Sequence, residues 1–336
     1  MKILISSHSF APSLGGIETV GRLLAEQFVR LGHEVKVVTQ TQSQANQEYC
    51  YEIIPQPFSA QLWNATRWCD LVWHNNLSLR TIWPVLFLRR PVVITHHGSY
   101  CRPASGLDLA HRVKRMVVGC HTSVAVSQAV AECFRTKSSV IGGPYDSDLF
   151  RLLPDVRERS LDLVFLGRLV SEKGVDLLLE ALGQLKSEHF LPRLTIIGNG
   201  PEFSHLSELT DRLKLGNQVN FAGAKRGREL VELLNRHKVL VVPSRYDEPF
   251  GIVALEGIAC GCVVVGSNRG GLRESIGPCG FTFPNGDASA LGQALARILR
   301  QPEERARLRA GAAQHLAKFQ PATVARSYLN LFEAVQ

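Results

Sequence analysis

Short apolar runs rich in β-branched residues alternate with helical stretches along almost the whole chain, and this alternation restricts the fold more than any other feature. Runs this short and this continuously apolar are typical of strands buried on both faces of a parallel sheet. The first half therefore predicts a doubly wound α/β domain, with helical stretches such as Ile17–Leu31 and Ser127–Phe134 between its strands. The predicted strands are residues 2–7, 34–39, 70–74, 91–95, 121–126 and 138–142.

The same alternation starts again after the charged segment 151–160, which we interpret as a linker. A chain of 336 residues is long enough for two domains. We therefore expect an α/β fold of two doubly wound, Rossmann-like domains that face each other across a cleft, formed by residues 1–150 and 151–320, with a last helix at 321–336 packing back on the first domain. The predicted strands of the second half are residues 161–166, 193–198, 218–222, 238–243 and 262–266.

Composition indicates a globular protein of the cytoplasm. Apolar residues make up 45% of the chain, and Met1–Ile5 leads straight into a short strand instead of a long apolar segment that could act as a signal or cross a bilayer. The eight cysteines form no Cys-x-x-Cys pair and show no zinc-site spacing. We expect reduced thiols and no structural metal.

The net charge of +8 is distributed unevenly. Between Arg89 and Arg115 the only acid is Asp108, so this segment forms a basic cluster. A solvated surface, an anionic lipid surface and an acidic substrate all fit such a cluster. Nucleic acid fits less well, because no aromatic residues interleave with the bases and no groove-reading motif is present. The bases are Arg89, Arg90, Arg102, Arg112, Lys114 and Arg115.

Two glutamates, Glu248 and Glu256, bracket a segment that begins at the end of a predicted strand and continues as a helix. Eight residues at about 100° each bring the second glutamate to nearly the same helical face as the first. Both carboxylates are then expected to point toward the edge of the sheet where doubly wound domains bind ligands. By themselves they also fit a solvated acid beside a surface ion pair, or a glycosidase pair.

Three further segments place glycines or cations at predicted strand ends. Gly15-Gly16 opens a helix after the first strand, where backbone N–H groups can approach an anion. Arg168 and Lys173 follow the first strand of the second half, where a phosphate would be met. The turn 197–201 combines two glycines with a proline. Each segment also has a purely structural interpretation, and none has the Gly-x-Gly-x-x-Gly spacing of a dinucleotide oxidoreductase.

Taken together and in this order, the segments resemble the retaining glycosyltransferases of family 4, which have the glycosyltransferase B fold and use nucleotide sugars. The resemblance spans nearly the whole chain. It is carried by Gly15-Gly16-Ile-Glu18, Thr95-His96-His97-Gly98, Gly-Arg168…Lys173-Gly, the Gly198-Asn-Gly-Pro turn, Glu248…Glu256 and Gly270-Gly271-Leu-Arg-Glu274.

The resemblance implies a role for each matched residue. Arg168 and Lys173 would hold the donor diphosphate, Glu248 would contact the transferred sugar, and Glu256 would accept hydrogen bonds from the ribose. His97 would lie beside the donor sugar, and the choice of His97 over His96 rests on its adjacency to Gly98. The implied catalytic residues are His97, Glu248, Arg168 and Lys173, and the implied donor-binding residues are these last three with Gly16, Phe250, Gly251, Ile252 and Glu256.

The implied function is retaining hexosyl transfer in polysaccharide biosynthesis, with a UDP-sugar as the expected donor and a glycan or lipid-linked saccharide as acceptor. No cofactor or metal is expected, and Asp146-Ser-Asp148 is interpreted as an acidic turn. The basic cluster suggests a peripheral position at the inner face of the cell membrane. The sequence leaves two alternatives open, a nucleotide-sugar epimerase of the same architecture and a non-catalytic sugar-nucleotide-binding protein.

Overall fold

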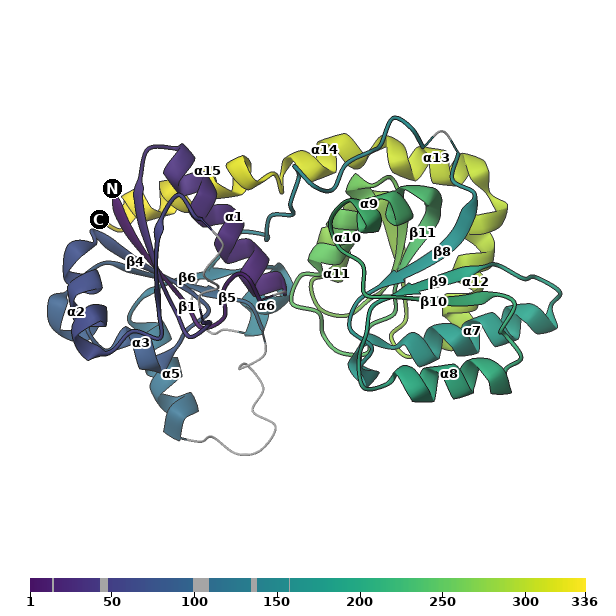
Figure 1. Cartoon of the computed structure of the whole chain (residues 1–336), viewed down its shortest axis with the longest axis horizontal. Helices are drawn as coiled ribbons and strands as arrows, with labels where there is room; N and C mark the ends of the chain where they lie inside the picture. Colours follow the sequence, from purple (N-terminus) through teal and green to yellow (C-terminus); the bar gives the residue numbers. More distant parts are fainter. Residues whose placement is uncertain (14, 43–47, 99–108, 134–137, 157) are drawn as a thin grey trace. The chain divides into compact units, whose positions relative to one another are not determined.

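The computed structural model describes residues 1–13, 15–42, 48–98, 109–133, 138–156 and 158–336 (Figure 1). The chain divides into two compact units. Unit 1 consists of Met1–Asp146 together with Phe319–Gln336, and unit 2 consists of Ser147–Lys318. The sequence analysis placed the two divisions after residues 150 and 320.

Unit 1 is built on a seven-stranded sheet with the strand order β3-β2-β1-β4-β5-β6-β7. Its strands pair in parallel throughout the described residues. The order reverses between β1 and β4, which is the switch point of a doubly wound sheet. The strands are β1 (Lys2–Ser7), β2 (Glu34–Thr39), β3 (Glu52–Pro55), β4 (Leu71–Asn75), β5 (Val92–His96), β6 (Thr122–Ala125) and β7 (Ser138–Val140).

Helices cover both faces of this sheet, because successive side chains of each strand point to opposite faces. On one face, Leu4, Val72 and Ile94 pack with α2 (Ser59–Trp68), α3 (Leu79–Ile82), α4 (Val85–Leu88) and α5 (Leu109–Gly119). On the other face, Trp73 lies 5.9 Å from Phe28 of α1 (Gly16–Arg30), measured between ring centroids. A short helix, α6 (Gln128–Cys133), connects β6 to β7.

The last helix of the chain, α15 (Pro321–Ala334), packs beside α1 and completes this second face (Figure 1). The ring of Tyr328 lies 5.1 Å from that of Trp73, and Phe332 lies 5.6 Å from Phe28. Thr95 connects the strand to the helix, since its hydroxyl accepts from the Trp73 indole at 2.9 Å and lies 3.0 Å from the Tyr328 hydroxyl. Residues from both ends of the chain therefore share one core.

Unit 2 contains a six-stranded parallel sheet with the order β10-β9-β8-β11-β12-β13 and a switch point between β8 and β11. The strands are β8 (Leu161–Leu166), β9 (Leu194–Ile197), β10 (Val219–Gly223), β11 (His237–Val242), β12 (Val263–Ser267) and β13 (Gly280–Phe283). The helices are η1 (Ser171–Lys173), α7 (Val175–Ser187), α8 (Phe203–Arg212), α9 (Gly227–Arg236), α10 (Ile252–Ala259), α11 (Leu272–Ile276), η2 (Gly277–Cys279), α12 (Ala288–Arg300), α13 (Pro302–Ala310) and α14 (Ala312–Ala317).

The helices of unit 2 form two layers around its sheet. Helices α7, α8 and α12 pack with Phe165 and Val241 in one apolar cluster on one face (Figure 1). Helices α9, α10 and α11 lie on the other face. There Gly257 of α10 lies so close to β11 that an added Cβ would be 2.5 Å from the Leu240 side chain. This close approach brings the body of α10 directly against β11.

The sequence analysis missed two edge strands, β3 and β13. Each has four residues, and they contain glutamate, proline or glycine, which are depleted in strands. The central strands were predicted more accurately because they are buried on both faces and rich in valine, isoleucine and leucine.

In the described part of the chain, no helix is both long and apolar enough to cross a membrane. The seven described cysteines are free thiols, and Cys101 lies outside the described residues.

Candidate functional site

The predicted site residues that follow strands lie at the carboxyl edge of each sheet. In unit 2, β8 leads into the segment that carries Arg168 and Lys173, and β11 leads into the loop that carries Glu248. Because β8 and β11 are adjacent parallel strands, these two segments leave the sheet at the same edge. In unit 1, the corresponding edge carries Gly16 after β1 and His97 after β5. Doubly wound sheets bind ligands at this edge.

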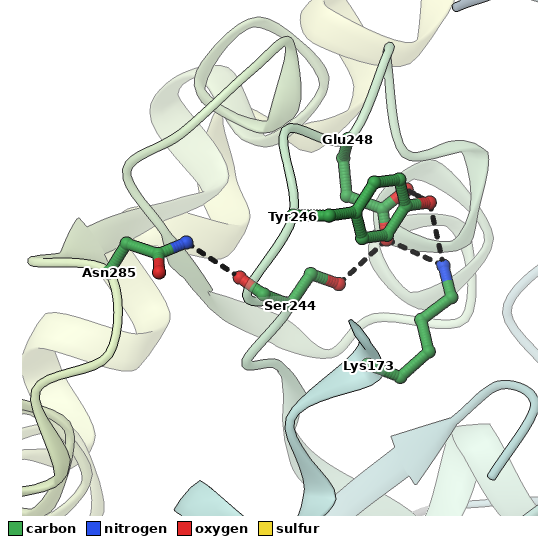
Figure 2. A network of polar contacts seen from close by, with 5 residues as sticks. All are labelled: Lys173, Ser244, Tyr246, Glu248 and Asn285. Atoms are coloured by element: carbon green, nitrogen blue, oxygen red, sulfur yellow. Dashed lines mark hydrogen bonds and ion pairs between the residues drawn. The ribbon is translucent and has the colours of Figure 1, made fainter. Parts of the chain in front are cut away.

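Glu248 is held by three hydrogen-bond donors (Figure 2). Its side chain is buried, with the residue only 5% exposed. Oε1 accepts from Lys173 Nζ at 2.6 Å and from Ser244 Oγ at 2.7 Å, while Oε2 accepts from Tyr246 Oη at 2.5 Å. A buried carboxylate is costly unless it is paired and hydrogen-bonded, and this network meets both conditions.

Tyr246 connects the two charged members of the network. Lys173 Nζ donates to Tyr246 Oη at 3.1 Å and lies 4.9 Å from the centre of the tyrosine ring. Burial, followed by the charge of Glu248, raises the pKa of Tyr246 well above its ordinary value. The phenol therefore stays protonated and donates a hydrogen bond to Glu248. A carboxylate has about four acceptor positions, so three donors leave roughly one for a ligand hydroxyl.

The loop that carries Glu248 is itself fixed by backbone contacts. Asn285 donates through Nδ2 to the carbonyl oxygen of Ser244 at 2.9 Å (Figure 2). The same nitrogen also donates to the carbonyl oxygen of Arg245 at 3.2 Å. The Gly271 N–H donates to the Glu248 carbonyl at 2.7 Å. These bonds hold the backbone on both sides of Glu248.

Two glycines of the sequence motifs are required by close backbone approaches. Gly270 has a φ of +66°, and an added Cβ would lie 2.1 Å from the carbonyl oxygen of Glu248. Gly198 has a φ of +147°, and its Cβ would lie 1.8 Å from the carbonyl oxygen of Gly167, next to Arg168. Neither space accepts a side chain. Both motifs therefore support the loops that carry the charged residues.

Arg168 lies at the same edge as this network. It follows β8 and is exposed, and its positive charge opposes the rise in the pKa of Tyr246. Lys173 ends the 3-10 helix η1 and is half-buried against Glu248. One cation is thus paired within the protein, while the other is open to solvent.

The second glutamate of the motif, Glu256, lies on α10 and is half-buried. Gly251, in the left-handed conformation with a φ of +87°, caps the start of this helix. The first N–H groups of a helix have no partner within it, so the backbone N–H groups of Gly251 and Ile252 are at the end that attracts anions. Phe250, just before them, is buried.

In unit 1, Gly16 is the first residue of α1 and is exposed. Asn75, at the end of β4, ties this helix start to the sheet. Its Nδ2 donates to the Ile17 carbonyl at 2.9 Å and to Ser7 Oγ at 3.2 Å. The carboxylate of Glu18 turns back toward Gly15, where an added Cβ would lie 2.3 Å from Oε2.

Asn75 also orients His97. The Oδ1 atom of Asn75 lies 2.6 Å from His97 Nε2, and because an amide oxygen only accepts, Nε2 carries the proton. Burial, followed by the neighbouring His96, lowers the pKa of His97 to about 3, so the ring is neutral near pH 7 and Nδ1 carries the lone pair. His96 is the last residue of β5 and is completely buried. Of the two histidines, His97 is the one at the exposed edge.

In the acidic turn Asp146-Ser-Asp148, Asp146 forms an ion pair with Arg22 at 2.7 Å. Within the described ranges, no group of three or more His, Cys, Asp or Glu side chains is arranged to hold a metal ion.

Sequence reasoning missed Ser244, Tyr246 and Asn75. Each follows or ends a buried strand next to a switch point, so position alone was the available signal. The contacts between Tyr246, Lys173 and Glu248 depend on side-chain directions that a sequence pattern does not specify.

Comparison with known families covers both halves of the chain. Residues 154–315 match the family model described as "Glycosyl transferases group 1". Residues 14–142 match the model described as "Glycosyltransferase Family 4".

Similar proteins match over part of their length. A glycogen synthase from Mycobacterium tuberculosis is 35% identical over 178 residues, which are 52% of this chain and 43% of that protein. A D-inositol 3-phosphate glycosyltransferase from Stackebrandtia nassauensis is 34% identical over 196 residues, 55% of this chain and 43% of that protein. The matched stretch thus spans less than half the length of each relative.

Solved structures share the fold over the whole chain. Anabaena HepE, in complex with UDP and glucose, superposes with a TM-score of 0.83 at 21% identity and covers 99% of this chain and 100% of that one. Sucrose-phosphate synthase from Thermosynechococcus elongatus gives 0.79 at 22% identity, with 99% and 98% covered.

Proposed function

Because the chain belongs to the group 1 and family 4 glycosyltransferases with the B fold, we propose that it transfers a hexosyl residue from a nucleotide diphosphate sugar to a saccharide acceptor. We further propose that transfer retains the anomeric configuration and needs no metal ion. A UDP-sugar is the expected donor, since HepE, which shares the fold, is known in complexes with UDP and with UDP-glucose.

The observation that carries this proposal is the ion pair between half-buried Lys173 and buried Glu248 at the switch point of unit 2. Breaking the bond between an anomeric carbon and a diphosphate leaves negative charge on the departing oxygen, which fixed positive charge stabilises. Arg168 and Lys173 supply that charge in the proposed mechanism. Each charge-assisted hydrogen bond contributes about 1.5–3 kcal/mol, so loss of either cation should reduce turnover by roughly one to two orders of magnitude.

The carboxylates act in donor binding in this mechanism. Glu248 accepts a hydrogen bond from a hydroxyl of the transferred sugar at its remaining acceptor position. Glu256 accepts hydrogen bonds from the ribose hydroxyls. Glu248 is a poor nucleophile, because both of its oxygens already accept hydrogen bonds. This supports transfer on a single face, with the leaving phosphate oxygen taking the acceptor proton, over a double displacement through a glycosyl-enzyme. The N–H groups of Phe250, Gly251 and Ile252 face the sugar or phosphate.

In unit 1, the proposed donor contacts are Gly16 and His97. The backbone at Gly16 approaches the diphosphate at the start of α1. His97, held through Nε2 by Asn75, accepts a hydrogen bond from a sugar hydroxyl at Nδ1. A neutral imidazole at this position adds no positive charge to the oxocarbenium-like carbon, which a protonated ring would repel.

The decisive experiment is a thermal-shift screen of UDP-, GDP- and ADP-sugars, because a ligand at a hundredfold excess over its dissociation constant adds about 2.7 kcal/mol of stability. A hit is then incubated with and without saccharide acceptors, and the product's anomeric configuration is determined by NMR. Lys173→Ala should reduce transfer by roughly one to two orders of magnitude. Lys186→Ala, which removes a lysine bonded to the Lys214 carbonyl, should leave transfer unchanged. An epimer formed without acceptor would favour an epimerase instead, and binding without any turnover would favour a sensor.

We also propose that the acceptor is a glycan or lipid-linked saccharide of polysaccharide biosynthesis, met at the inner face of the cell membrane. The basic cluster supports this position, since Arg89, Arg112 and Arg115 are exposed on unit 1. Arg102 and Asp108 lie outside the described residues. Attraction between this cluster and anionic lipids should weaken as salt is added.

A further inference from the structure

Three large apolar side chains are exposed on the face of unit 1 that α2, α4 and α5 cover. Leu86 and Phe87 on α4 are 62% and 70% exposed, and Met116 on α5 is 66% exposed. Single exposed apolar residues are ordinary on a protein surface, but several on the outer side of one helical layer favour an interaction site. We call Leu86, Phe87 and Met116 the apolar patch.

Phe87 of the apolar patch packs against two tryptophan rings. Trp63 of α2 stacks with Trp83 at 6.0 Å between centroids. Phe87 lies 6.3 Å from Trp63 and 6.5 Å from Trp83. Three rings from two segments therefore hold one another in place. An exposed phenylalanine fixed in this way loses little conformational entropy on binding.

The turn after α4 is fixed as well. Arg89 takes the left-handed conformation, with a φ of 47°, and its N–H donates to the Val85 carbonyl at 3.1 Å. Arg90 donates to the carbonyl of Arg67, at the end of α2, at 2.7 Å. Leu86 and Phe87 are thus exposed on a fixed segment, and Arg89 and Arg90 follow them closely in the sequence.

Helix α5 belongs to the same face. Its residues Val113 and Val117 pack into the apolar cluster that also contains Trp83 and Val85 of the α4 segment. Arg112, Arg115 and Met116 on this helix are exposed. An apolar side chain and two cations therefore share the outer surface of α5.

The sequence around the patch is almost free of acids. Residues 71–131 contain seven Lys and Arg residues against the single acid Asp108, a difference of +6. These bases are Arg80, Arg89, Arg90, Arg102, Arg112, Lys114 and Arg115. A surface with exposed aromatic and aliphatic tips and basic neighbours matches the interfacial region of an anionic bilayer, where apolar tips enter the acyl boundary and cations meet the headgroups.

We propose that the apolar patch inserts into the interface of an anionic membrane and anchors unit 1 there. This goes beyond donor chemistry and rests on none of the donor-site residues. It also differs from attraction by the basic cluster alone. Electrostatic attraction is screened by salt, whereas burial of Leu86, Phe87 and Met116 in the acyl boundary is not.

The test is co-sedimentation of the full-length protein with vesicles of phosphatidylcholine containing or lacking phosphatidylglycerol, at low and high salt. We expect binding to phosphatidylglycerol vesicles that weakens with salt but does not vanish. Leu86→Ser/Phe87→Ser should remove the salt-resistant part and lower affinity at least about tenfold, given the apolar area lost. Arg112→Glu/Arg115→Glu should remove the salt-sensitive part.

The matched control is Leu152→Ser/Leu191→Ser, which removes two leucines of unit 2 that are 64% and 56% exposed. It should bind vesicles like the unchanged protein. Thermal unfolding and nucleotide binding of all variants are measured in parallel, so a folding defect or a failed donor site is seen separately. Equal vesicle binding by Leu86→Ser/Phe87→Ser and the unchanged protein would overturn the proposal. So would a patch-dependent dimer in analytical ultracentrifugation that does not bind vesicles.

Discussion

Tyr246 shows how a neutral side chain can organise two charged ones. It donates to Glu248, accepts from Lys173 and places its ring beside the ammonium group. Without it, Glu248 would lose one of three donors while remaining buried. Lys173 would at the same time lose a contact that directs it toward the edge of the sheet.

We predict that Tyr246→Phe lowers kcat/KM for transfer by about tenfold, because one hydrogen bond to a charged group contributes about 1.5–3 kcal/mol and part of this loss can be recovered by water. Steady-state kinetics with the donor identified in the screen provide the measurement. Tyr51→Phe is the matched control, since the Tyr51 hydroxyl is buried without a partner in the described chain. A Tyr246→Phe enzyme as active as the Tyr51→Phe enzyme would remove Tyr246 from the site.

A buried histidine should make the protein sensitive to mild acid. His74 is fully buried in β4, and neither ring nitrogen has a partner in the described part of the chain. Burial, followed by the charge of His121, lowers its pKa to about 3. Its folded pKa lies below the unfolded value of about 6.5, so the unfolded state binds the proton first. The stability is therefore complete above about pH 6.5 and is lost as the pH falls toward 3.

His74→Leu should accordingly reduce the slope of unfolding free energy against pH by about 1 kcal/mol per pH unit in this window. Urea unfolding at several pH values between neutral and mildly acid measures the slope. His96, His97 and His237 also have lowered pKa values and should keep part of the dependence. The exposed His205 gives the control substitution, and a His74→Leu slope equal to that of His205→Leu would contradict the assignment.

At the scale of elements, the loop between β11 and α10 depends on a glycine from a different loop. Gly270→Ala would place a methyl group 2.1 Å from the Glu248 carbonyl oxygen while keeping a φ of +66°. We predict a loss of at least about 2 kcal/mol of stability and of the donor-induced thermal shift, because the Glu248 backbone must move. Gly286→Ala has a similar φ of +80° but open space around the Cβ. It should cost about 1 kcal/mol and leave donor binding intact.

These elements also show what a sequence pattern can predict. Buried central strands such as β8, β11 and β12 follow from runs of valine and leucine, and the residues at their ends were predicted to be functional for that reason. The contact between Lys173 and Glu248 could not be predicted in the same way, because it joins residues 75 positions apart. It depends on β8 and β11 being neighbours and on which way two flexible side chains turn. The requirement for Gly270 depends on the same three-dimensional detail.

At the scale of the whole molecule, unit 2 is one continuous segment, whereas unit 1 is formed from both ends of the chain. Phe332→Ala should therefore destabilise unit 1, since this fully buried ring contacts Phe28, Trp73 and Tyr328. Loss of a buried phenylalanine costs about 3–5 kcal/mol. Tryptophan fluorescence should show that unit 1 unfolds at a lower temperature than in the unchanged protein. The nucleotide-induced shift in melting temperature reports on unit 2. Glu333→Ala, the exposed neighbour, is the control, and equal melting of the two variants would contradict the role of α15.

The position of α15 also has a consequence for protein synthesis. The ribosome completes the strands of unit 1 and then makes all of unit 2 before α15 emerges. At about 5–20 residues per second, the part of the sheet face that α15 covers stays exposed for roughly ten to forty seconds. During this interval the nascent chain exposes an aromatic surface to chaperones and to aggregation. Unit 2 can thus finish folding before unit 1, although its first residue is translated later.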